Sequence, residues 1–480
     1  MSVYFGENDF ELIKAQRLGE YQDNCIKSIQ SHAEKLNKKS LNEIYPSEMM
    51  NIPISKKDKG YLGKLVEIYH FGIKPNNNPE PDFPKVNLEL KTTGLTEKNK
   101  AKERLSLSMI NYHEIVNQTF EDFLKKNSKV LIIFYQYKKN EIYYKMKFAY
   151  NIIIDFHSLP ESDKTVIKAD WKKIVQAVKD AKAHEISGGD TFYLKADTKG
   201  CSGGMQSQPF SDIKAKPRAF CFPGSYLSSL IKLDVSESLN QIYGKIIKNS
   251  KNFKDIEGFI ISKFKSFYNL SCEDIEKLLG VTILNNKAKN YYANLSKGIL
   301  GIDFKQKIEE FEKGNICVKT IRVEEDNSIE QSVSFSAFKF IKLCSEDWED
   351  SETRELFEQR FIFIFYKKKN SEYFLEKVKF WNMPYTDRGE VRKVWLKTKE
   401  LLNTGKIVKS EKSNINGKTI TYNFFPKKSE NKVCHVRPHG STKKETYELP
   451  VIEKTTGAKK FTKQCFWINH DYIRDEVYLK

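Results

Sequence analysis

Apolar residues recur along the chain with two different periods, which predicts a mixture of helices and strands. From Gly60 onward they recur at helical spacing, which predicts an amphipathic helix with one apolar face made of Leu62, Leu65, Val66 and Tyr69. Between residues 86 and 95 apolar and polar residues alternate instead, as they do in a half-buried strand. Further strands are predicted at 103–110, 130–137 and 142–150, and a further helix at 162–183.

Two runs are more apolar than the rest of the chain, Val130–Tyr135 and Phe361–Tyr366. Each has the length of a strand, far below the roughly 18 apolar residues that a membrane-spanning helix needs. The first ten residues lack a basic segment followed by an apolar core, so the sequence predicts no signal peptide. We therefore expect a cytoplasmic protein with no membrane partner.

A repeated pattern divides the chain into two halves. The segment Asp82–Thr92 (DFPKVNLELKT) matches Glu310–Thr320 (EFEKGNICVKT) at five of eleven positions, with an offset of 228 residues. Three further matches follow in the same order at similar offsets: 103–112 with 331–340, 130–140 with 361–370, and 219–227 with 465–473. Four ordered matches predict two related domains.

A Lys-rich stretch with helical character separates the two halves. Inside it, Ser271 precedes CEDIEKLL in a pattern typical of a capped helix. We therefore expect three parts: an N-terminal domain over 1–235, a helical connector over 236–300 and a C-terminal domain over 301–480.

The charge of the chain points to a polyanionic partner. The 480 residues contain 81 Lys plus Arg against 63 Asp plus Glu, which gives a net charge of +18. This excess favours nucleic acid before membrane, because each contact with a phosphate releases counterions. The eight cysteines include no Cys-x-x-Cys pair, so we expect reduced thiols and no structural zinc site.

Three charged residues of the first repeat have a spacing that suits phosphodiester hydrolysis. Glu89 and Lys91 lie two apart on a predicted strand and project from one face, while Leu88 and Leu90 face the core. Asp82 precedes the strand in a proline-rich loop and can fold back toward Glu89. Two converging carboxylates bind Mg²⁺, and a nearby lysine can position water and stabilise phosphate charge. The same spacing is also common in solvated charge pairs on exposed strands.

The surroundings of these residues resemble the MutH family, which contains the mismatch-repair strand-nicking endonuclease and type II restriction enzymes that cut GATC. The shared pattern is KG-aromatic-x-G-x3-E, then a loop, then DFP-x4-ELKT. In this sequence it falls on Lys59, Gly60, Tyr61, Gly63, Glu67, Asp82, Phe83, Pro84, Glu89, Leu90, Lys91 and Thr92.

This resemblance implies roles for individual residues. Glu67, Asp82 and Glu89 are implied to bind the metal, and Lys91 is implied to be the catalytic lysine. A second catalytic lysine of the family falls most naturally on Lys126 in FLKKNSKVL, with Lys125 and Lys129 as neighbouring alternatives.

The likeness extends over most of the chain to the restriction enzymes of the Sau-three-A type, through its doubled length, 182–189 (KAHEISGG), 208–220 (QPFSDIKAKPRAF) and the second half. It implies a type II restriction endonuclease that recognises GATC in duplex DNA and uses Mg²⁺ to cut both strands before the G. The fold implied is α/β, with two tandem restriction-endonuclease-like (MutH-like) domains, each a mixed sheet flanked by helices.

The second half departs from the catalytic pattern. Its counterparts of Asp82, Glu89 and Lys91 are Glu310, Cys317 and Lys319. A thiol is not the hard oxygen ligand that Mg²⁺ requires. We therefore expect the second domain to be catalytically degenerate, with a regulatory or DNA-binding role. One active site per chain predicts that two chains meet on the palindromic site to cut both strands.

The second half also contains KVCHVRPHGS, which resembles the Arg-Pro segment that enters DNA in MutH. This implies DNA contacts by Arg437 and Pro438, with His439 beside them. In the first half the corresponding residues are Lys195 and Ala196, and a lysine offers guanine only a point donor where an arginine offers a fork.

The basic segment SDIKAKPR supplies three more candidates for phosphate contacts: Lys214, Lys216 and Arg218. A merely solvated basic loop is an equal alternative for this segment. Two other functions also remain open for the whole chain, a GATC-specific nickase of the mismatch-repair type and a non-catalytic sequence-specific DNA-binding protein.

Overall fold

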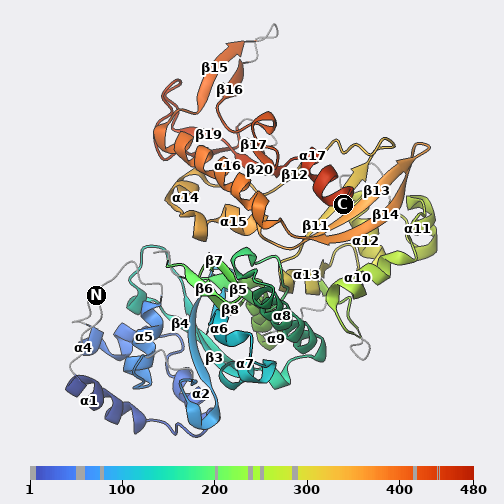
Figure 1. The fold of residues 1–480 in the computed structure, drawn as a ribbon. Helices are drawn as coiled ribbons and strands as arrows, with labels where there is room; N and C mark the ends of the chain where they lie inside the picture. The colour runs from blue at the N-terminus through green and yellow to red at the C-terminus, as the bar shows by residue number, and fades with distance from the viewer. Residues whose placement is uncertain are drawn as a thin grey trace.

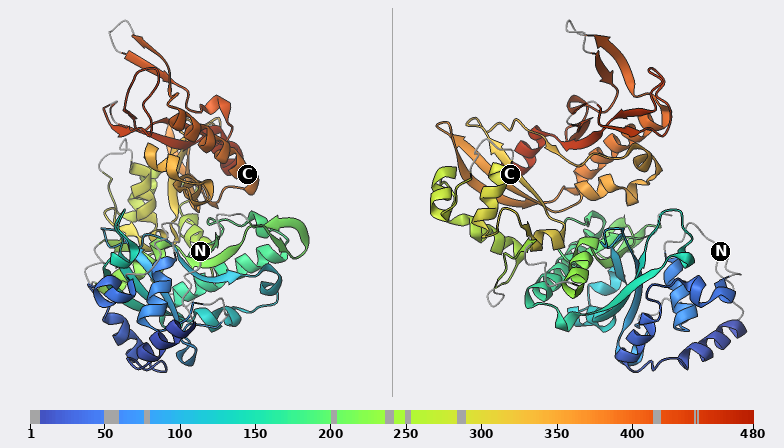
Figure 2. Two further views of the ribbon diagram at one scale, coloured as in Figure 1. Left: turned by 90° about the vertical axis from the view of Figure 1, so that its left-hand side faces the viewer. Right: turned by 180° about the vertical axis from the view of Figure 1, so that it is seen from behind.

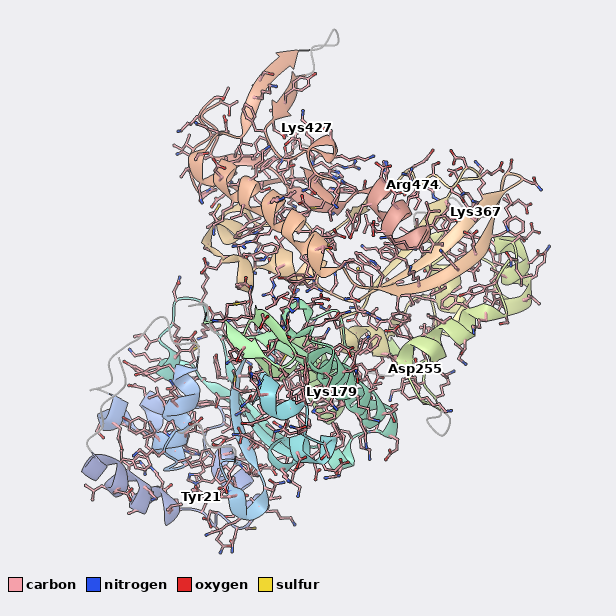
Figure 3. The ribbon with its side chains drawn as sticks, in the orientation of Figure 1. Tyr21, Lys179, Asp255, Lys367, Lys427 and Arg474 are labelled. Carbon is pink, nitrogen blue, oxygen red and sulfur yellow. The ribbon has the colours of Figure 1, made fainter. Side chains whose placement is uncertain are left out.

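The computed structural model describes residues 7–49, 60–75, 80–199, 204–235, 242–248, 253–283, 290–413, 419–440, 442 and 444–480. The two halves of the chain lie one above the other in Figure 1, with the first half (blue to green) below the second (yellow to red). In Figure 3, Tyr21 lies near the lower end of the first half and Lys427 near the upper end of the second.

The first half is built on two three-stranded sheets. Its strands are β1 (Glu89–Leu95), β2 (Leu105–Ile110), β3 (Lys129–Gln136), β4 (Phe148–Asp155), β5 (Lys195–Thr198), β6 (Gln206–Gln208), β7 (Ser211–Ala215) and β8 (Arg218–Phe222). One sheet has the order β1-β3-β4, with β1 parallel and β4 antiparallel to β3. The other has the order β2-β8-β5 and is antiparallel, and β6 and β7 form a separate hairpin.

Helices and short turns surround these sheets. They are α1 (Glu7–Leu18), α2 (Ile26–Glu34), α3 (Leu41–Ile44), α4 (Pro46–Met49), α5 (Tyr61–Leu65), the π-helical η1 (Val66–His70), the 3-10 turns η2 (Pro84–Val86), η3 (Tyr143–Lys145), η4 (Phe156–Ser158) and η5 (Ala183–Glu185), and α6 (Tyr112–Ile115), α7 (Phe120–Asn127), α8 (Glu161–Lys179) and α9 (Gly224–Val235).

The second half repeats this plan. Its strands are β9 (Tyr243–Gly244), β10 (Lys307–Ile308), β11 (Cys317–Val323), β12 (Val333–Ser334), β13 (Phe361–Lys369), β14 (Glu372–Trp381), β15 (Val408–Ser413), β16 (Thr419–Asn423), β17 (Cys434–Pro438), β18 (Thr446–Glu448), β19 (Lys460–Thr462) and β20 (Gln464–Ile468). The order β11-β13-β14 has the same strand directions as β1-β3-β4, and β12-β20-β17 corresponds to β2-β8-β5.

The helices of this half are α10 (Ile256–Lys265), α11 (Cys272–Leu279), α12 (Tyr291–Ile299), α13 (Glu309–Gly314), α14 (Phe340–Ser345), α15 (Glu352–Phe357), α16 (Tyr385–Thr404) and α17 (His470–Tyr472), followed by the π-helical η9 (Ile473–Tyr478) and accompanied by 3-10 turns at Trp348–Asp350 and Lys428–Glu430. The hairpin β15–β16 projects from the end of the second half in both views of Figure 2.

Local details confirm the internal repeat. Glu89 is paired with Val130 at the start of the first mixed sheet, and Cys317 is paired with Phe361 at the same place in the second. Two residues before each of these strands an asparagine adopts the left-handed conformation, with φ of 52° at both Asn87 and Asn315. The chain therefore enters both strands through the same turn.

The central strand of each mixed sheet is buried on both faces. Val130, Ile132 and Phe134 of β3 face one core, and Leu131 and Ile133 face another that packs beneath α2 and α5. This explains why these runs are continuously apolar and do not alternate. The strand β13 has the same arrangement, with Phe361, Phe363 and Phe365 on one face and Ile362, Ile364 and Tyr366 on the other.

The segment expected to be a connector is part of the second half. The Ser271 hydroxyl accepts a hydrogen bond from the Asp274 amide at 3.1 Å, which confirms the predicted helix cap. However, α10 and α11 pack on β14, and α12 packs on β11, so these helices cover one face of the second mixed sheet. Their apolar residues are needed there because that face is otherwise open to water.

Two expected elements differ from the sequence prediction. Residues 142–150 are not one strand: Tyr143–Lys145 form η3, and β4 begins only at Phe148, whose backbone bonds to Lys38 and Lys39. The predicted helix at 162–183 ends at Lys179, because Ala181 adopts a positive φ of 60°. In the described part of the chain no helix is long and apolar enough to cross a membrane.

Buried polar contacts join the two halves. The Lys313 ammonium on α13 lies 3.0 Å from Asp163 on α8 and 2.9 Å from Glu309, and its side chain is almost fully buried. The side chains of Phe192 and Phe380 pack edge to face beside it. Farther out, a cleft of about 1210 Å³ separates the halves, lined by both basic and acidic residues.

Candidate active site

The loop before β1 folds back on the strand, as the sequence predicted. The Phe83 and Leu88 backbones exchange hydrogen bonds of 2.9 and 3.2 Å around the tight turn at Asn87. As a result the Asp82 carboxylate reaches the strand and accepts a hydrogen bond of 2.8 Å from the Leu90 amide. Asp82 is thereby fixed beside Glu89 rather than exposed at a loop tip.

Two lysines meet at the Glu89 carboxylate, whose side chain is only 4% exposed. The Lys91 ammonium contacts Glu89 Oε1 from the same strand face, and the Lys126 ammonium lies 3.8 Å from the same oxygen. The neighbouring Lys125 instead pairs with Asp122 at 2.7 Å on the helix surface. Lys126, rather than Lys125, is therefore the lysine that pairs with Glu89.

Helix α7 delivers Lys126 to this position. Its first turn is closed by a capping box between Thr119 and Asp122. Its last turn is tied to β2, because the Asn127 side chain donates a hydrogen bond of 3.1 Å to the Ser108 hydroxyl. The end of α7 thus lies against both sheets of the first half.

Glu67 lies on η1, close enough to Asp82, Glu89 and Lys91 for their charges to act on it. The predicted amphipathic helix changes from α-helical to π-helical geometry at Val66, and such insertions are frequent at functional sites. Burial raises the pKa of Glu67 to about 7, with the Asp82 carboxylate as the next largest cause. Burial and the Glu89 carboxylate likewise raise the pKa of Asp82. Three acids therefore share one poorly solvated region.

The donor set suits a magnesium ion that is completed by other ligands. Glu89 Oε2 is buried without a hydrogen-bond partner, as expected of a carboxylate oxygen that would bind a cation. Among the described residues, no three His, Cys, Asp or Glu side chains are arranged to hold a metal by themselves. Mg²⁺ commonly takes only one or two carboxylates and fills its shell with water and substrate phosphate.

Comparisons with known proteins bear on this site. A family model described as the DNA mismatch repair enzyme MutH matches residues 71–170, which include Asp82, Glu89, Lys91 and Lys126. The type II restriction enzyme Sau3AI of Staphylococcus aureus is 33% identical over 88% of this chain and 93% of that enzyme. The chain belongs to the Sau3AI family of type II restriction enzymes. The mismatch repair protein MutH of Vibrio cholerae is 23% identical over 42% of the chain and 93% of its own length.

The second half of this Sau3AI-family chain arranges the equivalent positions differently. The Lys319 ammonium donates to the Ser334 carbonyl oxygen at 3.2 Å rather than to a carboxylate. Glu310 turns away, and its buried carboxylate accepts hydrogen bonds of 2.8 to 3.1 Å from the Ile246 and Ile247 amides. Burial raises the pKa of the Cys317 thiol, which disfavours a thiolate ligand.

Two of the expected DNA contacts of this Sau3AI-family protein are buried in the first half. The Arg218 guanidinium donates to the Ala196 and Ile186 carbonyl oxygens, and the Lys195 ammonium donates to the Gly188 carbonyl. Both side chains hold β5 in place and are about 4% exposed, so the structure contradicts the expectation that they grip DNA directly. Lys214 is exposed on β7, whereas Lys216 pairs with Glu349 of the second half.

The sheet register also corrects one sequence correspondence. Arg437 lies opposite Cys465, and the matching residue of the first half, Ala219, lies opposite Asp197. Asp197, not Lys195, is therefore the counterpart of Arg437. The expectation failed because strand pairing, not local sequence likeness, sets this register.

Arg437, Pro438 and His439 are exposed at the edge of the β12-β20-β17 sheet of the second half. The Arg437 guanidinium lies 3.9 Å from the centre of the Trp467 ring, which holds it extended at the surface.

The sequence analysis missed one ion pair in the cleft. The Arg104 guanidinium contacts Asp197 and also lies 2.9 Å from Glu355 of the second half. The match of 219–227 with 465–473 does not reveal this ion pair, because only the pairing of β5 with β8 places Asp197 at the Arg437 position. The position of the base-reading candidate Arg437 in the second half is thus occupied in the first half by Asp197, whose charge is neutralised by Arg104.

Proposed function

We propose that the chain is a Mg²⁺-dependent endonuclease that hydrolyses both strands of duplex DNA at GATC, before the G. The observation that carries the proposal is the meeting of Lys91 and Lys126 at Glu89, beside Asp82. A DNA-binding regulator without catalysis has no need for two acids, Asp82 and Glu89, held together beside two lysines. The likeness to Sau3AI and to MutH proteins supports the same activity.

Each residue of this group has a separate role in the proposed reaction. Asp82 and Glu89 would hold the magnesium ion, and the buried Glu67 would complete the acidic pocket. A magnesium ion held there would polarise the phosphate as a Lewis acid and would lower the pKa of a bound water. Lys91 would position the attacking water, and Lys126 would stabilise the negative charge that develops on the phosphate in the transition state.

The second half serves, in this proposal, as a pseudo-nuclease that binds DNA through Arg437, Pro438 and His439. It has the thiol of Cys317 at the position of the Glu89 carboxylate, and its Lys319 donates to the Ser334 carbonyl oxygen. Two chains must then associate on the palindromic site, because one chain offers one cleavage centre for two strands. Analytical ultracentrifugation with and without a GATC duplex tests this; efficient double-strand cleavage by a strictly 1:1 complex would contradict it.

A plasmid digest tests the proposed activity. Wild-type protein is incubated with unmethylated and adenine-methylated plasmid, with Mg²⁺ or with EDTA. The proposal expects linear fragments with ends at GATC, in Mg²⁺ only, on at least one of the two plasmids. Nicked circles alone would favour the strand-nicking activity of the related mismatch repair proteins, and bound but uncut DNA in Mg²⁺ would overturn the assignment.

A further inference from the structure

The hairpin β6–β7 carries a large aromatic residue at a position that favours glycine. Gln208 pairs with Ser211, so Pro209 and Phe210 are the two central residues of the turn. Phe210 has a φ of +65°, which matches the third position of a type II turn. Glycine or asparagine is preferred there, because a side chain on Cβ strains this conformation.

The folded chain does not compensate for this strain. Phe210 is 73% exposed at the tip of the hairpin, and Ile213 on β7 is 56% exposed. Met205, just before β6, is 47% exposed. Large apolar residues that are exposed together along one hairpin often mark a binding surface. These exposed apolar side chains are therefore candidates for contact with a binding partner.

The strand end next to the turn is anchored to the rest of the first half, so the tip is held in a fixed place. Gln208 is almost fully buried there, and its Oε1 accepts a hydrogen bond of 2.9 Å from the Ala183 amide. Its amide nitrogen donates to the Ile213 carbonyl oxygen. The left view of Figure 2 shows the green hairpin region at the edge of the first half.

A series of contacts links this hairpin with the active site. Lys126 beside Glu89 is followed by Asn127, which is hydrogen-bonded to Ser108 on β2. The next residue of β2, Met109, is 58% exposed.

Beyond Met109 the strand β2 leads into α6, which packs against β6. There a ring nitrogen of His113 lies 3.0 Å from the Ser207 hydroxyl. A duplex bound with its scissile phosphate at Glu89 and Lys126 would reach the hairpin if it ran along β2 and α6.

We propose that the β6–β7 hairpin inserts Phe210 into the minor groove of this duplex, against a base step that flanks the recognition site. The exposed Lys214 beside it would contact the adjacent phosphates. Apolar wedges inserted in this way partly unstack a base step and bend the duplex. This inference rests on the proposed endonuclease function and adds a DNA contact outside the cleaved sequence.

Two variants of the full chain separate binding from folding. Phe210→Asn removes the ring but suits the positive φ, so its midpoint of thermal unfolding should not fall below that of wild type. Phe210→Trp keeps an aromatic wedge. Leu278→Ala, which truncates a side chain that is 67% exposed on α11, serves as the control for loss of an exposed apolar group.

The readouts are affinity for a long GATC duplex without divalent metal, and the fluorescence of 2-aminopurine placed at each flanking step. Wild type and Phe210→Trp should enhance the fluorescence at one flanking step, and Phe210→Asn should lose this signal and bind about tenfold more weakly. Leu278→Ala should behave as wild type. On a duplex that ends close to GATC, Phe210→Asn and wild type should bind alike.

Failure of this inference is distinguishable from failure of the proposed function. Wild type that does not cleave GATC in Mg²⁺ overturns the function itself. Wild type that cleaves, with Phe210→Asn equal to it in affinity and 2-aminopurine signal, overturns only the wedge. A Phe210→Asn variant that changes sedimentation without DNA, and not DNA binding, would assign the hairpin to contacts between copies of the chain and also contradict the proposal.

Discussion

The Lys126 ammonium lies 3.8 Å from the Glu89 carboxylate, although the two residues come from a helix end and a strand that are distant in sequence. Its neighbour Lys125 points to Asp122 on the surface. If Lys126 stabilises phosphate charge, Lys126→Ala should lower the single-turnover cleavage rate by about 100-fold or more. Lys125→Ala is the matched control and should leave the rate nearly unchanged. Equal losses in both variants would contradict the role of Lys126.

The counterpart site in the second half should be dispensable for cleavage. Cys317→Ala removes a thiol that is not expected to bind Mg²⁺, and Lys319→Ala removes a hydrogen bond to the Ser334 carbonyl. Both variants should cleave GATC plasmid at nearly the wild-type rate. A folded Cys317→Ala enzyme that is inactive in the same assay would reverse the assignment of the two halves.

Glu67 should make the stability of the metal-free protein depend on pH. Its pKa is raised from 4.5 to about 7, so the folded state holds this proton more tightly than the unfolded chain. This difference in pKa stabilises the folded state fully below pH 4.5. The stabilisation, at most about 3 kcal/mol, is lost as the pH rises through about 7. Urea unfolding across this range should show a steeper loss for wild type than for Glu67→Gln. Identical slopes would contradict the burial of the Glu67 carboxyl.

A duplicated hydrogen bond provides a comparison of the two halves. The Tyr226 hydroxyl donates to Asp163 at 3.1 Å, and the Tyr472 hydroxyl donates to Asp387 at 2.7 Å, at the matching places of the repeat. Asp163 differs in one respect, because it also neutralises the buried Lys313 across the boundary between the halves.

Asp163→Ala should therefore destabilise the protein more than Asp387→Ala does. The first change leaves the buried ammonium of Lys313 paired with Glu309 but without Asp163, which costs about 3 kcal/mol or more. The second leaves a tyrosine hydroxyl unpaired, which costs about 1–3 kcal/mol. Chemical denaturation measures both, and a larger loss in Asp387→Ala would contradict the interface described for Lys313.

The repeat and the catalytic strand were predictable because both depend on local pattern. The five identities between the segments at Asp82 and Glu310 reflect the same turn and strand entry, which the structure has at Asn87 and Asn315. The alternation around Glu89 likewise predicts which residues face the core. These features require no knowledge of distant contacts.

Other features depended on contacts that the sequence does not display. The π-helical turn that carries Glu67 has the same apolar spacing as an ordinary helix, so its pattern cannot reveal it. Lys195 and Arg218 resemble surface cations in the sequence, and only the closure of β5 on β8 buries them. The helices at 256–299 were expected to link the halves. They pack instead on β11 and β14, because this face of the second mixed sheet would otherwise be open to water.

The most direct test of the account is to map the DNA ends produced by wild type and by Glu89→Ala on the same plasmid in Mg²⁺. The account predicts that wild type cuts both strands before the G of GATC, and that Glu89→Ala produces no ends while still binding GATC duplex with affinity near that of wild type. Cleavage at GATC by Glu89→Ala would show that the reaction occurs elsewhere in the chain and would contradict the central claim.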